Sequence, residues 1–166
     1  MDAGQKQTIM KMAGKYATHA MWSIADGEDL IPLLAYQDHG NQQRLERLVM
    51  DVEMAWKHYE ERLPQLASDG LGAVFIFNVI VTLEAGETEA LSVTIRFPCE
   101  ACQVIQLILP YRSASHKQGF RPEQLLVTGV QGCAREEMET LMDAFTEGMK
   151  SHSQGEAIWK VLFVSE

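Results

Sequence analysis

Long hydrophobic runs are missing from this sequence. No stretch reaches the roughly 18 consecutive apolar residues of a membrane span, and residues 1–15 contain no apolar core of the length that a signal peptide needs. Cysteine is also scarce, and three cysteines is an odd number that does not suggest the disulfide framework of a secreted domain. We therefore expect a cytoplasmic protein with reduced thiols and no membrane partner.

Basic residues are outnumbered in this chain. The sequence has 14 lysine and arginine residues against 23 aspartate and glutamate residues, for a formal net charge of -9. A charge of this sign repels phosphate backbones and anionic lipid unless a local basic stripe overrides it. The nearest such stripe is residues 110–122, which carry Arg112, His116, Lys117 and Arg121 interleaved with Tyr111 and Phe120. Aromatic rings can stack on bases, but we interpret this segment as a soluble loop and expect no nucleic-acid partner.

Prolines are few and give no sign of a linker. The five of them are spread along the chain, and there is no internal repeat and no low-complexity tract. Hydrophobic residues make up 46% and charged residues 22% of the sequence, a composition that is typical of globular proteins and argues against disorder. A chain of 166 residues is long enough to bury a sizeable core. We predict one domain over residues 1–166.

Motifs of known catalytic chemistry are missing as well. The chain has no His-Glu-x-x-His motif, no glycine-rich phosphate loop and no Gly-x-Ser-x-Gly motif, and its five histidines are scattered singly. Asp26 and Asp29 could form a carboxylate dyad, although aspartate also favours turns for backbone reasons. We therefore favour a protein that is not an enzyme and that needs no cofactor.

The sequence Cys-Glu-Ala-Cys at residues 99–102 is the most conspicuous motif. A thioredoxin-like site needs a helix after the first cysteine, but the residues after this motif alternate as in a strand. Cys99 and Cys102 could hold half of a tetrahedral zinc site, with Cys133 and His116 as further ligands. Their spacing matches no standard zinc pattern. Two cysteines that flank a turn by chance are the preferred interpretation, and a small enzyme or zinc protein is kept as an alternative.

Strand-length apolar runs fill the middle of the chain. Residues 73–83, 90–97 and 103–111 are rich in β-branched and aromatic side chains, and each gap between them suits a hairpin. A fourth run follows at residues 123–130. This meander over residues 73–130 predicts an α+β fold, with a single antiparallel sheet of five to seven strands and helices packed mainly on one face.

Helical periodicity flanks the meander. Residues 42–66 contain an apolar stripe at helical spacing. Residues 134–150 contain another, and their acidic start and closing Lys150 suit the helix dipole. We predict a helix over each range. The tail at residues 157–166 is short and rich in β-forming residues, so we predict a last strand there.

Residues 16–37 can be read in two ways. Apolar residues keep helical spacing through residue 24, and the glycine of Asp26-Gly27 would then stop the helix. Alternatively, Asp26-Gly27 is a two-residue hairpin turn. Gly14 and the β-branched and aromatic residues after it weaken the helix, so we predict that the helix ends near residue 15. The strands are then expected at residues 17–24 and 29–37.

Strand parity predicts the two faces of the sheet. Successive side chains of a strand point to opposite faces. A register that pairs odd positions with odd positions would gather a wholly apolar face, and that face should carry the helices. We predict near-complete burial of five residues on it: Phe77, Val79, Val93, Ile95 and Leu107.

The other face of the sheet, formed by the even-numbered residues of these strands, mixes polar residues with aliphatic ones. It is too polar for a dry core and too aliphatic for a solvated surface. A strand or loop from the N-terminal third of the chain could cover it in part, with the polar groups satisfied locally. Alternatively this face is functional, and its candidate ligand- or partner-binding residues are Arg96, Asn78, Gln106, Thr94 and Ser92.

The favoured function is a non-enzymatic binding or protein-interaction module that acts through this mixed face as a homodimer. Arg96 is central to it, because a guanidinium is always charged and suits a carboxylate or a phosphate. An acidic residue of the same chain is the ordinary partner for Arg96. Our hypothesis is a partner from outside the chain. The alternative function is the binding of a small anionic molecule, with Arg96 in the binding pocket.

Overall fold

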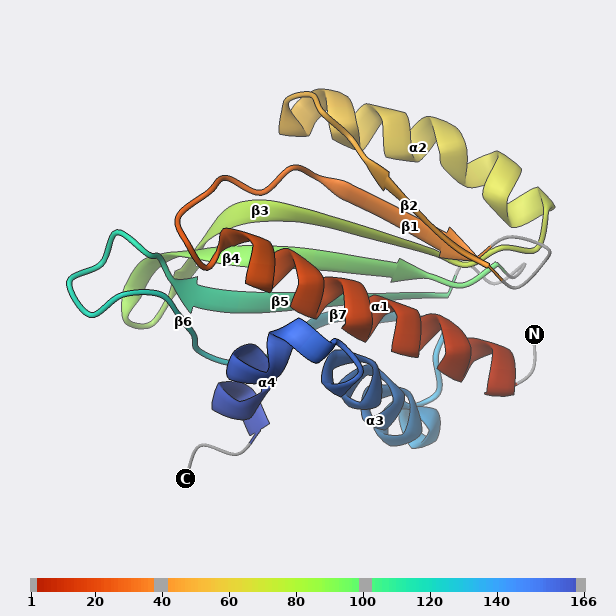
Figure 1. The fold of residues 1–166 in the computed structure, drawn as a ribbon. Coiled ribbons are helices and arrows are strands. Elements are labelled where there is room, and N and C mark those ends of the chain that lie inside the picture. The colour runs from red at the N-terminus through yellow and green to blue at the C-terminus, as the bar shows by residue number, and fades with distance from the viewer. Residues whose placement is uncertain (1–2, 38–41, 99–102, 164–166) are drawn as a thin grey trace.

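One antiparallel sheet of seven strands organises the chain (Figure 1). The structure is a computed structural model, and it describes residues 3–37, 42–98 and 103–163. The strands are β1 (Leu33–Gln37), β2 (Gln43–Arg47), β3 (Ala73–Leu83), β4 (Gly86–Arg96), β5 (Val104–Arg112), β6 (Arg121–Pro122) and β7 (Leu126–Gln131). The helices are α1 (Ala3–Ile24), α2 (Val52–Ser68), α3 (Arg135–Lys150) and α4 (Glu156–Phe163), with a short 3-10 turn at Ser153–Gly155.

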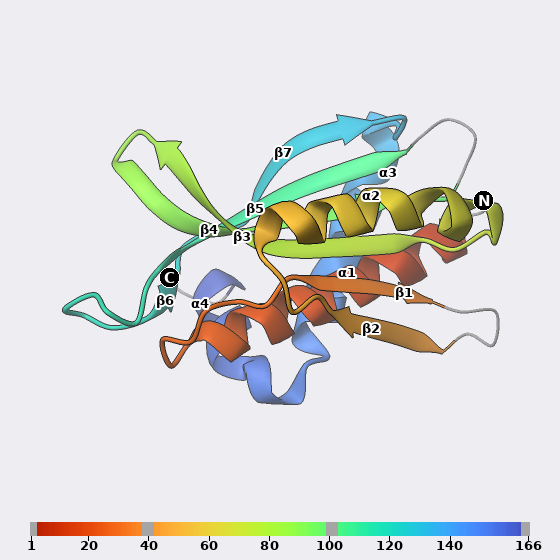
Figure 2. The ribbon, with the colours of Figure 1, turned by 90° about the horizontal axis from the view of Figure 1, so that it is seen from above.

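The helices are divided unequally between the two faces of the sheet. The strand order is β2-β1-β3-β4-β5-β6, and β7 also pairs with β5. α1, α3 and α4 cover one face, which we call the first face, and α2 lies alone over the other, the second face (Figures 1 and 2). This arrangement confirms the predicted α+β fold, including the meander and the concentration of helices on one side. None of the described helices is long and apolar enough to cross a membrane.

The register between β3 and β4 differs from the predicted one. Leu83 pairs with Gly86 across a two-residue turn, so every odd residue of β3 lies opposite an even residue of β4, as Phe75 does with Thr94. Hairpin register is set by the length of the turn, and a turn one residue longer or shorter would have kept odd with odd. The even residues of β3 therefore share the first face with the odd residues of β4 and β5.

The burial predicted from parity is confirmed for two strands and wrong for the third. Val93, Ile95 and Leu107 are fully buried on the first face, against α1 and α3. Phe77 and Val79 lie on the second face instead and are only half-buried. β3 fills the first face with its even residues, Val74 and Ile76 among them.

A second, aromatic core lies between α2 and the sheet. The ring of Tyr59 stacks on that of Phe75, with centroids 4.5 Å apart and planes 7° apart. Trp56 contacts the rings of Tyr59, Phe75 and Phe77. The cover of this face is therefore the helix α2, at residues 52–68, and the predicted strand or loop from the N-terminal third of the chain is wrong.

The predicted hairpin at residues 17–24 and 29–37 is wrong, because α1 continues to Ile24. The helix buries a continuous apolar stripe that includes Ala17 and Met21, and this burial outweighs the weak helix propensity of the segment. Gly27 has a φ of 102°, and its N–H donates to the carbonyl of Ile24. The Asp-Gly pair is thus a helix stop, and only residues 33–37 of the second predicted strand form β1.

Two further predictions fail at element boundaries. The helix predicted over residues 42–66 begins only after Asp51, whose carboxylate accepts a hydrogen bond of 2.9 Å from the N–H of Met54. Before that cap, residues 43–47 pair with β1 as a strand. The tail is the helix α4 and not a strand, and it buries Ile158 in the first-face core. In both segments long-range packing decides between local patterns that suit either state.

α1 and α3 approach each other backbone to backbone. A Cβ atom on Gly14 would lie 1.9 Å from the carbonyl oxygen of Phe145, and one on Gly148 would lie 2.0 Å from that of Lys11. Both distances are far inside van der Waals contact, so only glycine allows this approach. An ion pair of 3.1 Å between Lys6 and Glu137 joins the same two helices near their N-terminal ends.

We predict that Gly14→Ala destabilises the protein by about 2 kcal/mol or more. Overpacking costs roughly 1–3 kcal/mol, and here the obstacle is backbone that cannot turn aside. Alanine's better helix propensity returns only about 1 kcal/mol. Gly4→Ala, at an exposed site of the same helix, is the control and should not destabilise. Urea unfolding that gives equal stabilities for both variants would contradict the prediction.

A second prediction concerns the aromatic core. Phe75 is fully buried, so Phe75→Ala should cost about 3–5 kcal/mol, as core aromatic truncations do. Phe77 is half-buried, so Phe77→Ala should cost roughly half as much. Denaturant midpoints for the two variants measure the difference. The reverse order would mean that the β3 register is wrong.

Candidate functional site

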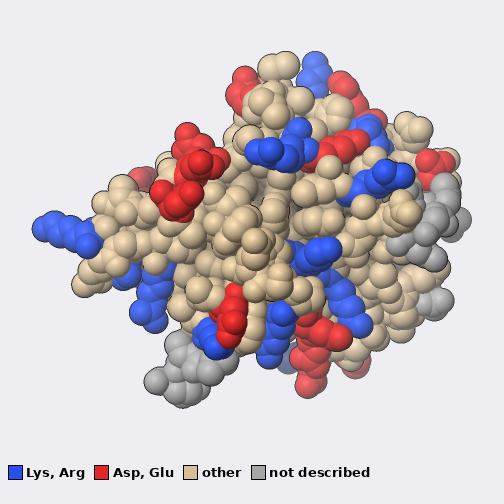
Figure 3. All heavy atoms as spheres, in the orientation of Figure 1, with Lys and Arg blue, Asp and Glu red and all other residues tan. Residues whose placement is uncertain are grey.

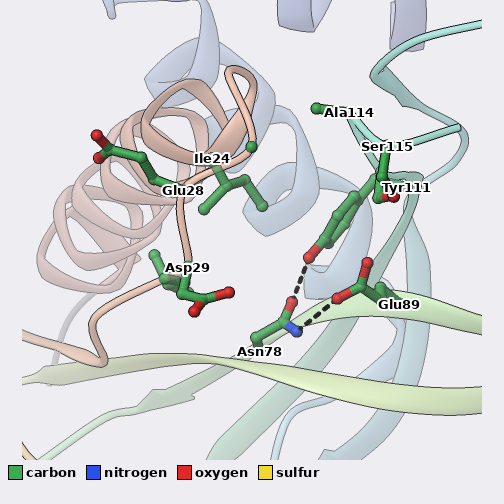
Figure 4. Close-up of a pocket in the computed structure, with 11 residues that line it drawn as sticks. Ile24, Glu28, Asp29, Asn78, Glu89, Tyr111, Ala114 and Ser115 are labelled. Atoms are coloured by element: carbon green, nitrogen blue, oxygen red, sulfur yellow. Dashed lines mark hydrogen bonds between the residues drawn. The ribbon is translucent and has the colours of Figure 1, made fainter.

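A pocket of about 210 Å³ opens on the first face where the β3–β4 hairpin extends past the end of α1 (Figure 4). Its walls come from segments that are far apart in the sequence. The lining residues are Ile24, residues 27–30 of the loop after α1, Asn78 of β3, Glu89 of β4, Tyr111 of β5, and residues 113–115 of the loop after β5.

Three polar side chains form a hydrogen-bonded chain in the pocket. The hydroxyl of Tyr111 donates to Oδ1 of Asn78 at 2.6 Å, and Nδ2 of Asn78 donates to Oε1 of Glu89 at 3.4 Å. Glu89 and Tyr111 are direct partners in the β4–β5 register, so the two strands hold these side chains next to each other. Tyr111 is only 6% exposed, so the packing around its ring holds these three hydrogen-bonded side chains in place.

The charged residues that line the pocket are acidic. The carboxylates are those of Glu28, Asp29 and Glu89, and among the described residues no lysine, arginine or histidine lines it. Acidic side chains also gather on the surface over the loop after α1 (Figure 3). Burial, then the charge of Glu89, raises the pKa of Tyr111, with a smaller contribution from Asp29. The phenol therefore stays protonated near neutral pH and remains a hydrogen-bond donor.

The pocket has spare acceptors but few spare donors. The Tyr111 hydroxyl and one N–H of Asn78 already donate hydrogen bonds, to Asn78 and to Glu89 respectively. The hydroxyls of Ser113 and Ser115 bond to each other at 2.7 Å. The Asp29 carboxylate points into the cavity, whereas Glu28 points away from it (Figure 4). A ligand that satisfies Asp29 and Glu89 must bring donors and positive charge of its own.

A second cavity, of about 400 Å³, is also lined by Tyr111. It shares Glu89, Tyr111, Ser113 and Ser115 with the first and adds Glu87, Arg112, His116 and Glu123, among others. Arg112 gives its donors to its own loop, to the carbonyl of Gly119 at 2.8 Å and to Oε1 of Gln118 at 2.9 Å. Its guanidinium therefore braces the loop. The aromatic residues of this segment, Tyr111 and Phe120, contact each other and pack against the first-face core.

Four of the five residues named from the sequence lie together on the second face: Ser92, Thr94, Arg96 and Gln106. Asn78 lies on the first face, in the pocket. Sequence reasoning missed Glu89 and Tyr111, because the pocket unites residues from distant segments. Two pocket residues were considered from the sequence: Asn78, as a candidate binding residue, and Asp29, as part of a dyad with Asp26.

Arg96 lies beneath α2, beside the ring of Tyr59. Burial raises the pKa of the Tyr59 phenol, and the Arg96 guanidinium opposes that effect. Within the described ranges no carboxylate forms an ion pair with Arg96, and its Nε has no hydrogen-bond partner. The cavity next to it holds about 10 Å³, which is room for one water at most. An external partner for Arg96 remains a prediction, and it would need α2 to move.

The zinc candidates are only partly covered by the structure. Cys99 and Cys102 lie outside the described residues. Cys133 is half-buried just before α3, and His116 lies in the exposed loop after β5. In the part of the chain that the structure describes, no three histidine, cysteine, aspartate or glutamate residues lie close enough together to hold a metal ion.

Two histidines far apart in the sequence meet beside α1. Nδ1 of His19 and Nε2 of His152 are 3.2 Å apart, and both rings contact Trp22. Burial, then the positive charges of Arg47 and Lys15, lowers the pKa of His19. Burial, then His19 and Lys15, lowers the pKa of His152. The pair is therefore neutral in the folded protein near pH 7.

Comparison with known proteins adds no relative: no family model, no curated protein and no solved structure matches this chain.

The histidine pair predicts that acid destabilises the fold before the carboxylates titrate. Because the folded pKa of each histidine lies below 6.5, the unfolded chain binds the protons more readily. The free energy of unfolding should keep its full value above about pH 6.5 and fall as the pH drops through the folded pKa values. His19→Gln with His152→Gln should flatten the change between pH 7.5 and 5.5. His116→Gln, in an exposed loop, is the control, and an unaltered profile in the double variant would refute this account.

Proposed function

We propose that the protein is a non-enzymatic binding module whose pocket at Asn78, Glu89 and Tyr111 takes a small organic cation with an amino group. The observation that carries this proposal is the charge of the lining, where the described residues supply three carboxylates and no basic side chain. An ammonium group supplies both the charge and the donors that Asp29 and Glu89 lack. Charge-assisted hydrogen bonds of this kind are about twice as strong as neutral ones.

The size and walls of the pocket narrow the ligand further. A volume of about 210 Å³ is below the roughly 300–1,000 Å³ of sites for drug-sized ligands, so the ligand has only a few carbon atoms. Ile24, Leu30 and Ala114 supply apolar wall that suits a short alkyl chain. The raised pKa of Tyr111 makes its phenol a poor general base, which supports binding without catalysis.

The test is titration of the whole chain with n-butylamine and putrescine, followed by NMR shifts of the Asn78 side-chain amide. Sodium butyrate has a similar length and the opposite charge, and it should leave these shifts unchanged. Glu89→Gln should weaken amine binding at least tenfold, because it removes the charge and keeps the shape. Glu123→Gln, which lines only the neighbouring cavity, is the matched control. Butyrate that binds as well as the amines, or parent-like affinity in Glu89→Gln, would overturn the proposal.

A second candidate function is the protein interaction predicted from the sequence, in which two copies associate through the second face. It is favoured by the apolar side chains exposed at and just before the start of α2. Val49 is 79% exposed and Met54 59% exposed, and Met50, Val52 and Trp56 are exposed nearby. Association along the edge strand β2 is better supported by complementary charges, and sedimentation equilibrium of variants at the two surfaces distinguishes them.

A further inference from the structure

β2 is an end strand of the sheet. It pairs with β1 on one side, and on its other side the described part of the chain places no strand. Figure 2 shows β2 at the margin of the sheet. Such an edge presents a row of backbone N–H and C=O groups that can accept another strand. It is therefore a surface where a further chain can add by main-chain hydrogen bonds.

The side chains of β2 divide between the two faces. Leu45 pairs with Ala35 and packs against the first-face core. Arg44 and Glu46 pair with Tyr36 and Leu34 and so lie on the second face, beside α2. Glu46 is held in place there, since its Oε1 accepts from Nη1 of Arg62 at 2.9 Å and from the Tyr36 hydroxyl at 3.2 Å.

We infer that β2 pairs antiparallel with β2 of a second copy of this chain, about a two-fold axis at Leu45. Such an axis is perpendicular to the sheet, so it keeps α2 on the same side in both copies. Leu45 then meets Leu45 of the second copy. Arg44 lies opposite Glu46 of the second copy, and Glu46 lies opposite Arg44 of the second copy. The five residues Gln43–Arg47 are thus complementary in charge to themselves.

The charges select one register. Moving the axis by one residue to Arg44 places the two copies of Arg44 opposite each other. Moving it the other way places the two copies of Glu46 opposite each other. Like charges directly opposite in a sheet are destabilising, and opposite charges are stabilising. Of these three symmetric pairings, only the one centred on Leu45 brings opposite charges together.

Charged side chains on an edge strand commonly prevent pairing. When all the charges on a strand have the same sign, they prevent pairing with a second copy in every register, because like charges always lie opposite each other. On β2 the sign alternates between Arg44 and Glu46 on one face, which penalises the wrong registers and favours one. Glu46 also forms an ion pair with Arg62 of its own chain, so Arg44 of the second copy would join an existing pair of charges. With only five residues on each side, we expect a reversible dimer that depends on concentration.

Sedimentation equilibrium of the full chain over a range of concentrations tests this inference. The parent should form dimers that weaken with added sodium chloride. Arg44→Glu should raise the dissociation constant at least tenfold, because the substituted side chain would then place a negative charge opposite Glu46 of the second copy. Glu46→Arg should do the same. An equimolar mixture of the two variants should associate again, since each chain then meets the opposite charge. Arg121→Glu, the same charge change on β6, is the control.

Four results would overturn the inference. They are a parent that is monomeric at millimolar concentration, an Arg44→Glu variant that dimerises like the parent, a mixture that does not associate, and an association lost in Val49→Ser with Met54→Ser but kept in Arg44→Glu. The last result would assign the interface to the second face. Far-ultraviolet circular dichroism checks that Glu46→Arg still folds. If it does not, Arg44→Glu and the salt dependence of the parent decide the question.

Discussion

The fold depends on the backbone contact between α1 and α3. Gly14 and Gly148 allow the two helices to touch without intervening side chains, and together the helices cover the first face of the sheet. Chain segments more than 130 residues apart are joined in this way, with the ion pair of Lys6 and Glu137 alongside. The apolar stripe that keeps α1 helical through Ile24 is buried in the same core, and Ile24 also lines the pocket.

The turn between β3 and β4 is the second constraint, and it bears directly on the site. A two-residue turn puts even residues of β3 on the same face as odd residues of β4 and β5. Asn78 is brought beside Glu89 and Tyr111 by this choice, and Phe75 and Phe77 are sent to the second face under α2. The length of this one turn therefore determines both the position of the hydrogen-bonded side chains in the pocket and that of the aromatic core under α2.

The parts of this fold that sequence could predict are those with strong local periodicity. The strands β3, β4, β5 and β7 and the helix α3 follow from their patterns, because each buries a face that its own residues mark. The residues of α1 and β2 carry patterns that suit a helix or a strand, and partners far along the chain decide between them. The burial predicted from parity was wrong for β3, because the pattern of hydrophobic residues does not specify the length of the β3–β4 turn. Of the pocket residues, only Asn78 was named as a candidate ligand- or partner-binding residue, since Glu89 and Tyr111 come together only when β4 and β5 pair.

Tyr111 has a further consequence for the first face. Tyr111 lines both the cavity of about 210 Å³ and the cavity of about 400 Å³, together with Glu89, Ser113 and Ser115. Its hydroxyl donates a hydrogen bond to Asn78, a residue that lines the smaller cavity. A substitution at this one position would therefore alter the walls of both cavities at once, without a change in the residues that carry the carboxylates.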